Sequence, residues 1–201
     1  MEQRQRILDA ALRIIHKEGF AALSMRKLAE RIEYSPASIY LYFENREQLA
    51  RELSEVGFQE LLGTLSMAAA VPGAVEALHA VGGAYVAWGI ANPEMYRLIF
   101  MGDSEFMTAA YGKQDEDSAG IRAYGALLDL ATRLQRDGVM KDASRVELAE
   151  LVWMTMHGIV SLHISCVEMK LSAPERLVRL ATEMVVRGGG GVQARVGGRK
   201  R

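Results

Sequence analysis

Apolar residues recur every three or four positions along most of the chain, and no segment alternates for long between apolar and polar residues. That spacing is typical of amphipathic helices. Residues 3–18 show it first, with Ile7, Ala11, Ile14 and Ile15 on one face and Arg4, Arg6, Arg13 and Lys17 elsewhere. Gly19 supplies the left-handed residue that commonly ends such a helix. The pattern predicts an all-α fold of about nine helices.

The stretch Ser24–Arg46 contains two short helical segments separated by a tight turn. Ser24 precedes Met25–Ile32 as an N-cap, because its hydroxyl can accept a hydrogen bond from a free amide of the first turn. Ser35 is a second N-cap, and Pro36 stands at the first helical position, where its missing N–H costs nothing. Two helices joined by a turn of about three residues form the helix-turn-helix arrangement, which places its second helix in a DNA major groove.

The second segment ends in aromatic residues. Ile39 and Phe43 are four positions apart, so both can face inward while their neighbours face outward. Asn45 then opens a longer helix, with Gln48 as its predicted capping-box partner. With the helix at residues 3–18 beneath it, the stretch is predicted to form a three-helix DNA-binding head.

The remaining three quarters of the chain is also predicted to be helical. We expect helices from Asn45 to about Pro72, over 74–92, from Ser118 to Asp137, from Ser144 to Leu171, and from Ser172 onward. The sequences Ser144-x-x-Glu147 and Ser172-x-x-Glu175 are typical capping boxes, and Pro174 lies in the first turn of the last helix. Residues 102–117 are predicted to be a long loop.

The helix over 148–171 is apolar nearly all round, which a chain of this size cannot easily cover by itself. Glu150, His157 and His163 interrupt the apolar run, so it is predicted to be a buried helix and not a membrane span. Paired final helices of this kind favour a homodimer through residues 144–186.

The net charge of −1 hides an uneven distribution. Residues 1–46 carry eight Lys or Arg against six Asp or Glu, residues 47–186 carry eleven against nineteen, and residues 187–201 carry five against none. Three parts follow: a mildly basic head (1–46), an acidic helical ligand-binding and dimerisation domain (47–186), and a Gly/Arg-rich flexible tail (187–201). The tail either adds non-specific phosphate affinity or has no specific role.

Other functional classes find little support. Cys166 is the only cysteine, which excludes an internal disulfide and, with no signal-peptide pattern, favours a cytoplasmic location. His163 and Cys166 lack the further ligands of a zinc site, and Asp115-Glu-Asp117 lacks the closing Glu of a calcium loop. No catalytic motif is recognisable, so we expect no catalytic residues, no metal and no cofactor.

The sequence ILDAALRIIHKEGFAALSMRKLAERIEYSPASIYLYFENREQL resembles the DNA-binding domain of TetR-family (tetracycline-repressor-like) transcriptional regulators. NPEMYRLIF and Trp153–Gly158 (WMTMHG) are similar to a ligand-domain subgroup with a W-x-x-x-H-G signature. The resemblance implies an all-helical homodimer in which ligand binding to the C-terminal domain alters DNA affinity. Two positions depart from it: Glu33–Tyr34 replaces the usual Gly-Val of the turn, and Tyr42 replaces the usual His.

Long cations, small side chains and exposed tyrosines suit contacts to phosphate and base edges. The predicted DNA-binding residues are Ser24, Arg26, Lys27, Ser35, Pro36, Ala37, Ser38, Tyr40, Leu41, Tyr42, Asn45 and Arg46. For the cations a solvated face is the alternative, for the tyrosines a packing role, and for Asn45 a cap alone. We expect a palindromic double-stranded DNA operator as the partner of this set.

Bulky and adaptable side chains of the second domain suit a small, partly apolar effector. The predicted effector-binding residues are Tyr85, Trp88, Met95, Tyr96, Phe100, Tyr124, Trp153, Met154 and His157. An ordinary helical core is the alternative for each of them. The sequence thus predicts a ligand-responsive transcriptional regulator that acts as a repressor. The alternatives are a helical small-molecule-binding protein without an operator, and an enzyme without recognisable motifs.

Overall fold

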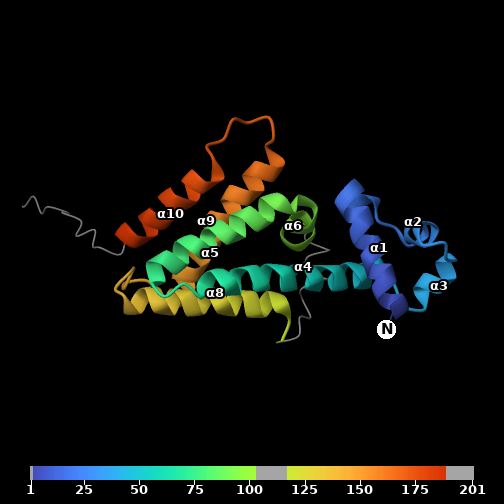
Figure 1. Cartoon of the computed structure of the whole chain (residues 1–201), viewed down its shortest axis with the longest axis horizontal. Helices are drawn as coiled ribbons and strands as arrows, with labels where there is room; N and C mark the ends of the chain where they lie inside the picture. The colour runs from blue at the N-terminus through green and yellow to red at the C-terminus, as the bar shows by residue number, and fades with distance from the viewer. Residues whose placement is uncertain (1, 103–116, 189–201) are drawn as a thin grey trace, which may run out of the picture. The chain divides into compact units, whose positions relative to one another are not determined.

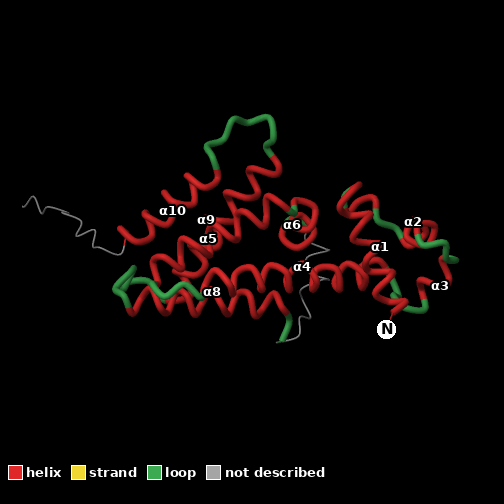
Figure 2. Tube along the Cα trace, in the orientation of Figure 1, coloured by secondary structure: helices red, strands yellow, loops and turns green. Residues whose placement is uncertain are grey.

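The computed structural model describes residues 2–102 and 117–188. These residues form helices and connecting loops, with no strand among them (Figures 1 and 2). The elements are α1 (Glu2–Glu18), a short 3₁₀ helix η1 (Phe20–Ala22), α2 (Met25–Arg31), α3 (Pro36–Tyr40), α4 (Arg46–Ala69), α5 (Ala74–Ala91), α6 (Pro93–Phe100), α8 (Ala119–Arg136), α9 (Arg145–Ser165) and α10 (Pro174–Gly188). The predicted all-α class is confirmed. Most of the predicted loop over 102–117 and of the tail over 187–201 lies outside the described residues.

The chain forms two compact units. The first contains Met1–Ser66 and Ala87–Gly125, and the second contains Met67–Val86 and Ala126–Arg201. The first unit therefore joins the helix-turn-helix segment to most of α4 and to α6. The predicted domain boundaries after residues 46 and 186 stay a prediction.

In the first unit, α1 forms the floor of the head, as its periodicity predicts. Ile7 and Ile15 are fully buried, and Ile14 is 2% exposed. Gly19 ends the helix with φ 79°, and its amide donates to the Ile15 carbonyl at 2.8 Å. The Arg4 guanidinium lies 5.0 Å from the centre of the Phe43 ring and pairs with Glu52. This contact ties the end of the aromatic segment to the first helix.

The second unit is built from parts of α5 and α8 with α9 and α10. Gly82 of α5 allows a close approach, because a Cβ there would lie 3.1 Å from Met156 Cε of α9. Gly82 therefore marks a point of close packing between α5 and α9. The His79 ring lies 3.3 Å from the hydroxyl of Thr182, which is 4% exposed. The buried hydroxyl is thus paired across α5 and α10.

Two predicted helix limits are wrong. The helix opened by the Ser144–Glu147 capping box is confirmed at its start but ends at Ser165 and not at Leu171. The last helix begins at Pro174, and the amides of Arg176 and Leu177 bond to the carbonyl of Ala173, so Ser172 does not cap it. The predicted position of Pro174 in the first turn is correct.

The residues between these two helices are held by His163. Its Nδ1 lies 2.7 Å from the Ile159 carbonyl, and its Nε2 lies 3.2 Å from the Ser172 carbonyl. The ring therefore lies between α9 and the chain that follows it, and the helix ends at Ser165, before the apolar run in the sequence ends.

Among the described residues, α5 is the one helix long and apolar enough to span a membrane. Half of its apolar window is buried inside the protein. The apolar helix α9 does not meet the same criterion. Burial to this degree is typical of a core helix, since a helix can be apolar because it packs against other helices.

Candidate DNA-binding site and effector-domain residues

Local caps set the position of α3, the second helix of the motif. The Ser35 hydroxyl accepts from the amide of Ser38 at 3.2 Å, and Pro36 stands at the first position. Ile39 and Phe43 are both fully buried and anchor one face. The predicted cap, proline position and inward pair are confirmed, and the opposite face is left to solvent.

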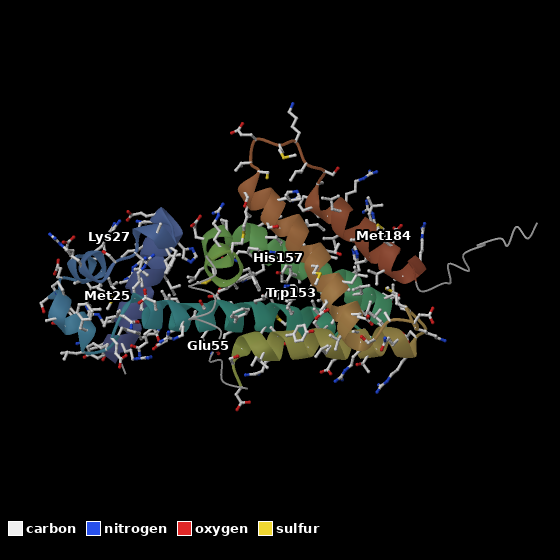
Figure 3. The ribbon with its side chains drawn as sticks, turned by 180° about the vertical axis from the view of Figure 1, so that it is seen from behind. Met25, Lys27, Glu55, Trp153, His157 and Met184 are labelled. Atoms are coloured by element: carbon white, nitrogen blue, oxygen red, sulfur yellow. The ribbon has the colours of Figure 1, made fainter. Side chains whose placement is uncertain are left out.

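The first helix of the motif, α2, is opened by Ser24, whose hydroxyl accepts from the Lys27 amide at 3.2 Å. Leu28 and Ala29 are fully buried and Met25 is 7% exposed, so the inward face is apolar. Met25 and Lys27 both lie on this helix in Figure 3. The inward face thus fixes α2 and leaves its cations toward the surface.

The turn between α2 and α3 contains a residue with left-handed backbone angles that is not glycine. Glu33 has φ 60°, as its place in the turn requires. The Tyr34 amide donates to the Ala29 carbonyl at 2.9 Å, and its ring lies 5.9 Å from the Arg6 guanidinium. The Tyr34 hydroxyl also bonds to the Gln3 side chain. A left-handed residue other than glycine costs roughly 1–2 kcal/mol, and these contacts with α2 and α1 hold the turn in that conformation.

The cations of α2 are paired with carboxylates. Lys27 bonds to Glu18, and Arg31 Nη2 lies 3.0 Å from the other oxygen of Glu18. The hydrogen bond from Lys27 is the main cause that lowers the pKa of Glu18. Arg26 Nε lies 3.0 Å from Glu30 on an exposed part of the same helix. These pairs are solvent-exposed, so each contributes little to stability but holds a cation in place.

The predicted DNA-binding residues of the α3 region lie mostly on the surface. Tyr40 is 52% exposed, Leu41 83% and Tyr42 37%. Ser35, Pro36 and Ala37 are also exposed, and Ser38 is half-buried. Between residues 32 and 45 the sequence has no Lys or Arg. The exposed face of α3 therefore consists of hydroxyls and apolar groups.

Asn45 and Arg46 have partners within the chain. The Asn45 side chain accepts from the Gln48 amide at 2.8 Å, and the Gln48 side chain accepts from the Glu44 amide at 2.7 Å, one residue before the predicted one. The Arg46 guanidinium lies 4.2 Å from the centre of the Phe20 ring and donates to the Phe20 carbonyl at 2.9 Å. A DNA contact by either residue stays a prediction, and the observed geometry gives both a structural role.

The predicted effector-binding residues fall into two groups, one in each compact unit. In the first unit, the ring of Tyr96 lies 6.5 Å from Trp88 and 4.9 Å from Phe100, measured between ring centres. Met95 is 2% exposed and Tyr96 is fully buried. Tyr124, at the start of α8, is half-buried in the same unit. These rings line the interior of the unit.

The second unit holds the other group. Trp153 Nε1 donates to the Tyr85 hydroxyl at 3.3 Å, which links α9 to α5. Trp153 and His157 project from α9 one turn apart (Figure 3). Burial lowers the pKa of His157. Met154 is 63% exposed and therefore lies on the surface of α9.

Three residues that position side chains in the head or in the effector-residue groups were not predicted from the sequence. Phe58 meets Phe100 edge to face, with ring centres 5.5 Å apart. Glu55 of α4, labelled in Figure 3, accepts from the Ala119 amide at the start of α8 at 3.0 and 3.2 Å. Glu18, which holds Lys27 and Arg31, could have been noticed in the sequence. A carboxylate in the last turn of a helix is unfavourable unless it has another partner. Glu55 left no such signal, because Ala119 is distant in the sequence.

Two models of known protein domains match this chain. The model for the N-terminal domain of bacterial regulatory proteins of the tetR family matches residues 7–53. The model for the tetracyclin repressor-like C-terminal domain matches residues 78–186, which is more than half of the chain. The chain belongs to the TetR family. Its helix-turn-helix lies within residues 7–53, the part that matches the N-terminal domain of these regulatory proteins.

Curated relatives match the TetR head. HdnoR, a nicotine-responsive transcriptional repressor of Paenarthrobacter nicotinovorans, is 28% identical over 65 residues, which are 32% of this chain and 34% of HdnoR. The transcriptional repressor KstR of Mycolicibacterium smegmatis is 44% identical over 48 residues, 24% of each chain. The chain thus spans about a quarter to a third of the length of these relatives.

Solved structures are similar over nearly the whole chain. A Rhodococcus protein of unknown function has a TM-score of 0.74 at 24% identity, covering 92% of this chain and 94% of its own. The regulator FadR of Bacillus subtilis, solved with stearoyl-CoA, has a TM-score of 0.72 at 16% identity, covering 92% and 98%. At these identities the similarity shows the fold of both domains and no shared ligand.

Proposed function

We propose that this TetR-family protein is a cytoplasmic repressor that binds a palindromic operator as a homodimer and leaves it when a small, partly apolar effector binds. The observation that carries the proposal is the geometry of α2 and α3. Ile39 and Phe43 bury one face of the second helix, while Tyr40 and its neighbours present the other face to solvent. This is the arrangement in which a recognition helix enters a major groove.

Exposed apolar side chains on the last two helices support the homodimer. On α9 these are Leu151, Trp153, Met154 and Leu162, and on α10 they are Leu180 and Met184. Met184 is 73% exposed, and its position on α10 is visible in Figure 3. A second copy of the same surface would remove these groups from water, since a two-fold interface pairs one patch with itself.

The two groups of aromatic and methionine residues support an effector with apolar character. Effector binding would favour a conformer in which the two recognition helices leave the spacing of about 34–36 Å that successive major grooves require. To change operator occupancy from 99:1 to 1:99, the effector must bind that conformer more tightly by about 5.5 kcal/mol. We infer no enzymatic activity, so a bound effector should be recovered unchanged.

Operator binding is tested with the DNA upstream of the gene at moderate salt. Tyr40→Ala removes an exposed ring without touching the core, so the fold should persist while affinity falls by at least tenfold. Met67→Ala, at a 75% exposed position of α4, is the control and should bind as the parent does. Equal affinity of Tyr40→Ala and the parent for the upstream DNA would show the recognition-helix assignment to be wrong.

The homodimer is tested by light scattering at micromolar concentration. Met184→Glu places a charge on the proposed interface and should shift the mass toward that of one chain. Met67→Glu introduces the same charge at a residue of equal exposure outside α9 and α10 and should leave the mass unchanged. A parent protein with the mass of one chain would refute the dimer.

The effector is tested first with stearoyl-CoA, chosen because a protein of the same fold was solved with it. Trp88 and Trp153 are the only tryptophans, one in each predicted group, so their fluorescence reports binding to either. The compound should quench that fluorescence and lower operator affinity together. Binding without any change in operator affinity would favour the helical small-molecule-binding protein without operator function.

A further inference from the structure

The outward face of α3 lacks the side chains that most often read bases in the major groove. Arginine and lysine read guanine, asparagine and glutamine read adenine, and Asp or Glu accepts from cytosine. Residues 35–42 are Ser, Pro, Ala, Ser, Ile, Tyr, Leu and Tyr, so they include none of these types. What remains exposed is a set of hydroxyls and the apolar side chains of Pro36, Ala37 and Leu41. Apolar side chains recognise the thymine methyl group.

The cations nearest in the sequence do not fill this gap on α3. Arg26 and Lys27 belong to α2 and are paired with Glu30 and Glu18. Arg46 lies over the Phe20 ring with its guanidinium half-buried. Arg26 and Lys27 suit phosphate contacts or the edge of the site, whereas base pairs directly under α3 meet a surface without charge.

Leu41 is the exceptional residue of this surface. Its side chain is 83% exposed, although Ile39, two positions before it, and Phe43, two positions after it, are fully buried. Leu41 keeps helical backbone angles, φ −69° and ψ −20°, so it continues the face of α3. Ala37 lies four positions earlier and therefore shares that face. A rise of about 1.5 Å per residue separates the two by about 6 Å along the helix.

We propose that Ala37 and Leu41 read the 5-methyl groups of two thymines within each operator half-site. Base pairs along one strand are about 3.4 Å apart, so a separation of about 6 Å places the two thymines roughly two base pairs from each other. The inference rests on the operator binding proposed above and adds the chemical class of base that α3 recognises. The hydroxyls of Tyr40 and Tyr42 then serve the phosphates on either side.

The test uses duplexes enriched by the full-length protein from a random pool. The enriched half-sites should share thymines at two positions about two base pairs apart. Replacing each of these thymines by deoxyuridine removes only the methyl group and should weaken binding about three- to tenfold, by analogy with burial of one methyl group. The same replacement outside the half-sites should have no effect.

A variant assigns the contact. In Leu41→Ala the penalty for one deoxyuridine should disappear, while the penalty at the other position persists. The salt dependence of binding should stay that of the parent, because the number of phosphate contacts is unchanged. Tyr40→Phe, which keeps the apolar face, should retain both penalties and serves as the matched control.

The outcomes separate the two proposals. If no duplex is enriched, operator binding itself fails and the inference falls with it. If the protein binds its enriched duplex equally well with thymine or deoxyuridine at every half-site position, operator binding stands and the thymine-methyl inference is overturned. A penalty that survives in both Leu41→Ala and Ala37→Gly overturns the assignment to these two residues.

Discussion

Met95 of α6 packs directly against the bare backbone of Gly57 on α4. A Cβ at residue 57 would lie 2.5 Å from the Met95 sulfur and 2.8 Å from its Cγ. The next residue, Phe58, meets the ring of Phe100 at the other end of α6. One turn of α4 thus contacts α6 at two places, and the absence of a side chain at Gly57 makes the closer contact possible.

Gly57→Ala should destabilise the protein by about 1–3 kcal/mol, because Met95 is only 2% exposed and has little room to move. Gly63→Ala is the matched control on the same helix, where an added Cβ meets nothing within 4 Å. That control should stabilise by about 0.4–1 kcal/mol. Urea unfolding of both variants checks the difference, and equal effects at the two positions would contradict the close contact.

Glu33→Gly should stabilise the protein by about 0.5–1 kcal/mol. The substitution removes the cost of a left-handed side-chain-bearing residue at φ 60° but adds the chain entropy that glycine loses on folding. Glu33→Ala removes the same carboxylate while keeping a Cβ, so it should give no such gain. Thermal unfolding distinguishes the two, and a gain in Glu33→Ala alone would attribute the effect to charge.

Glu18→Gln should tighten DNA binding severalfold at low salt. The carboxylate holds Lys27 and Arg31, and its removal leaves both cations to interact with phosphate. Because exposed charges are screened, the gain should shrink as salt is raised. Glu60→Gln, an exposed position of α4, changes net charge equally and should have a smaller effect. Fluorescence anisotropy titrations at two salt concentrations measure the DNA affinity of both variants. An equal gain in both variants would show that Glu18 acts only through the net charge of the protein.

His157 should make folding stability sensitive to acid. Burial lowers the pKa of its ring below the ordinary value of 6.5, so the unfolded chain binds a proton more readily than the folded one. The corresponding stability is fully present above about pH 6.5 and is lost as pH falls through the folded pKa. Urea midpoints from pH 8 to pH 5 should fall less in His157→Gln than in the parent. Parallel curves would contradict the prediction.

The local features of the head could be predicted because their causes lie within a few residues. Ser24, Ser35 and Asn45 each bond to an amide three positions later, and Gly19 takes the positive φ that its position after α1 indicates. Family resemblance extended this local evidence to the function. The start of α9 was predictable for the same reason.

Other features depend on residues far apart in the sequence, which periodicity does not relate. The helix predicted to reach Leu171 ends at Ser165, and the chain folds back so that the His163 ring lies 3.2 Å from the Ser172 carbonyl. The side chain of Arg46, predicted to contact DNA, lies over Phe20 of η1. The nine predicted effector-binding residues share a composition, but their division between two compact units required the structure.

Arg133 of α8 closes the end of α4. Its guanidinium donates to the carbonyls of Ala69 and Val71 at 2.7 Å each and to that of Pro72 at 3.1 Å. During synthesis these carbonyls emerge about sixty residues before their donor, whereas the contacts of α1 with Phe43 and Glu52 are complete by residue 52. At roughly 5–20 residues per second, the ribosome adds Arg133 about 4–16 s after residue 52. The DNA-binding head is therefore expected to fold first on the ribosome, with the corner between α4 and α5 open to water until α8 arrives.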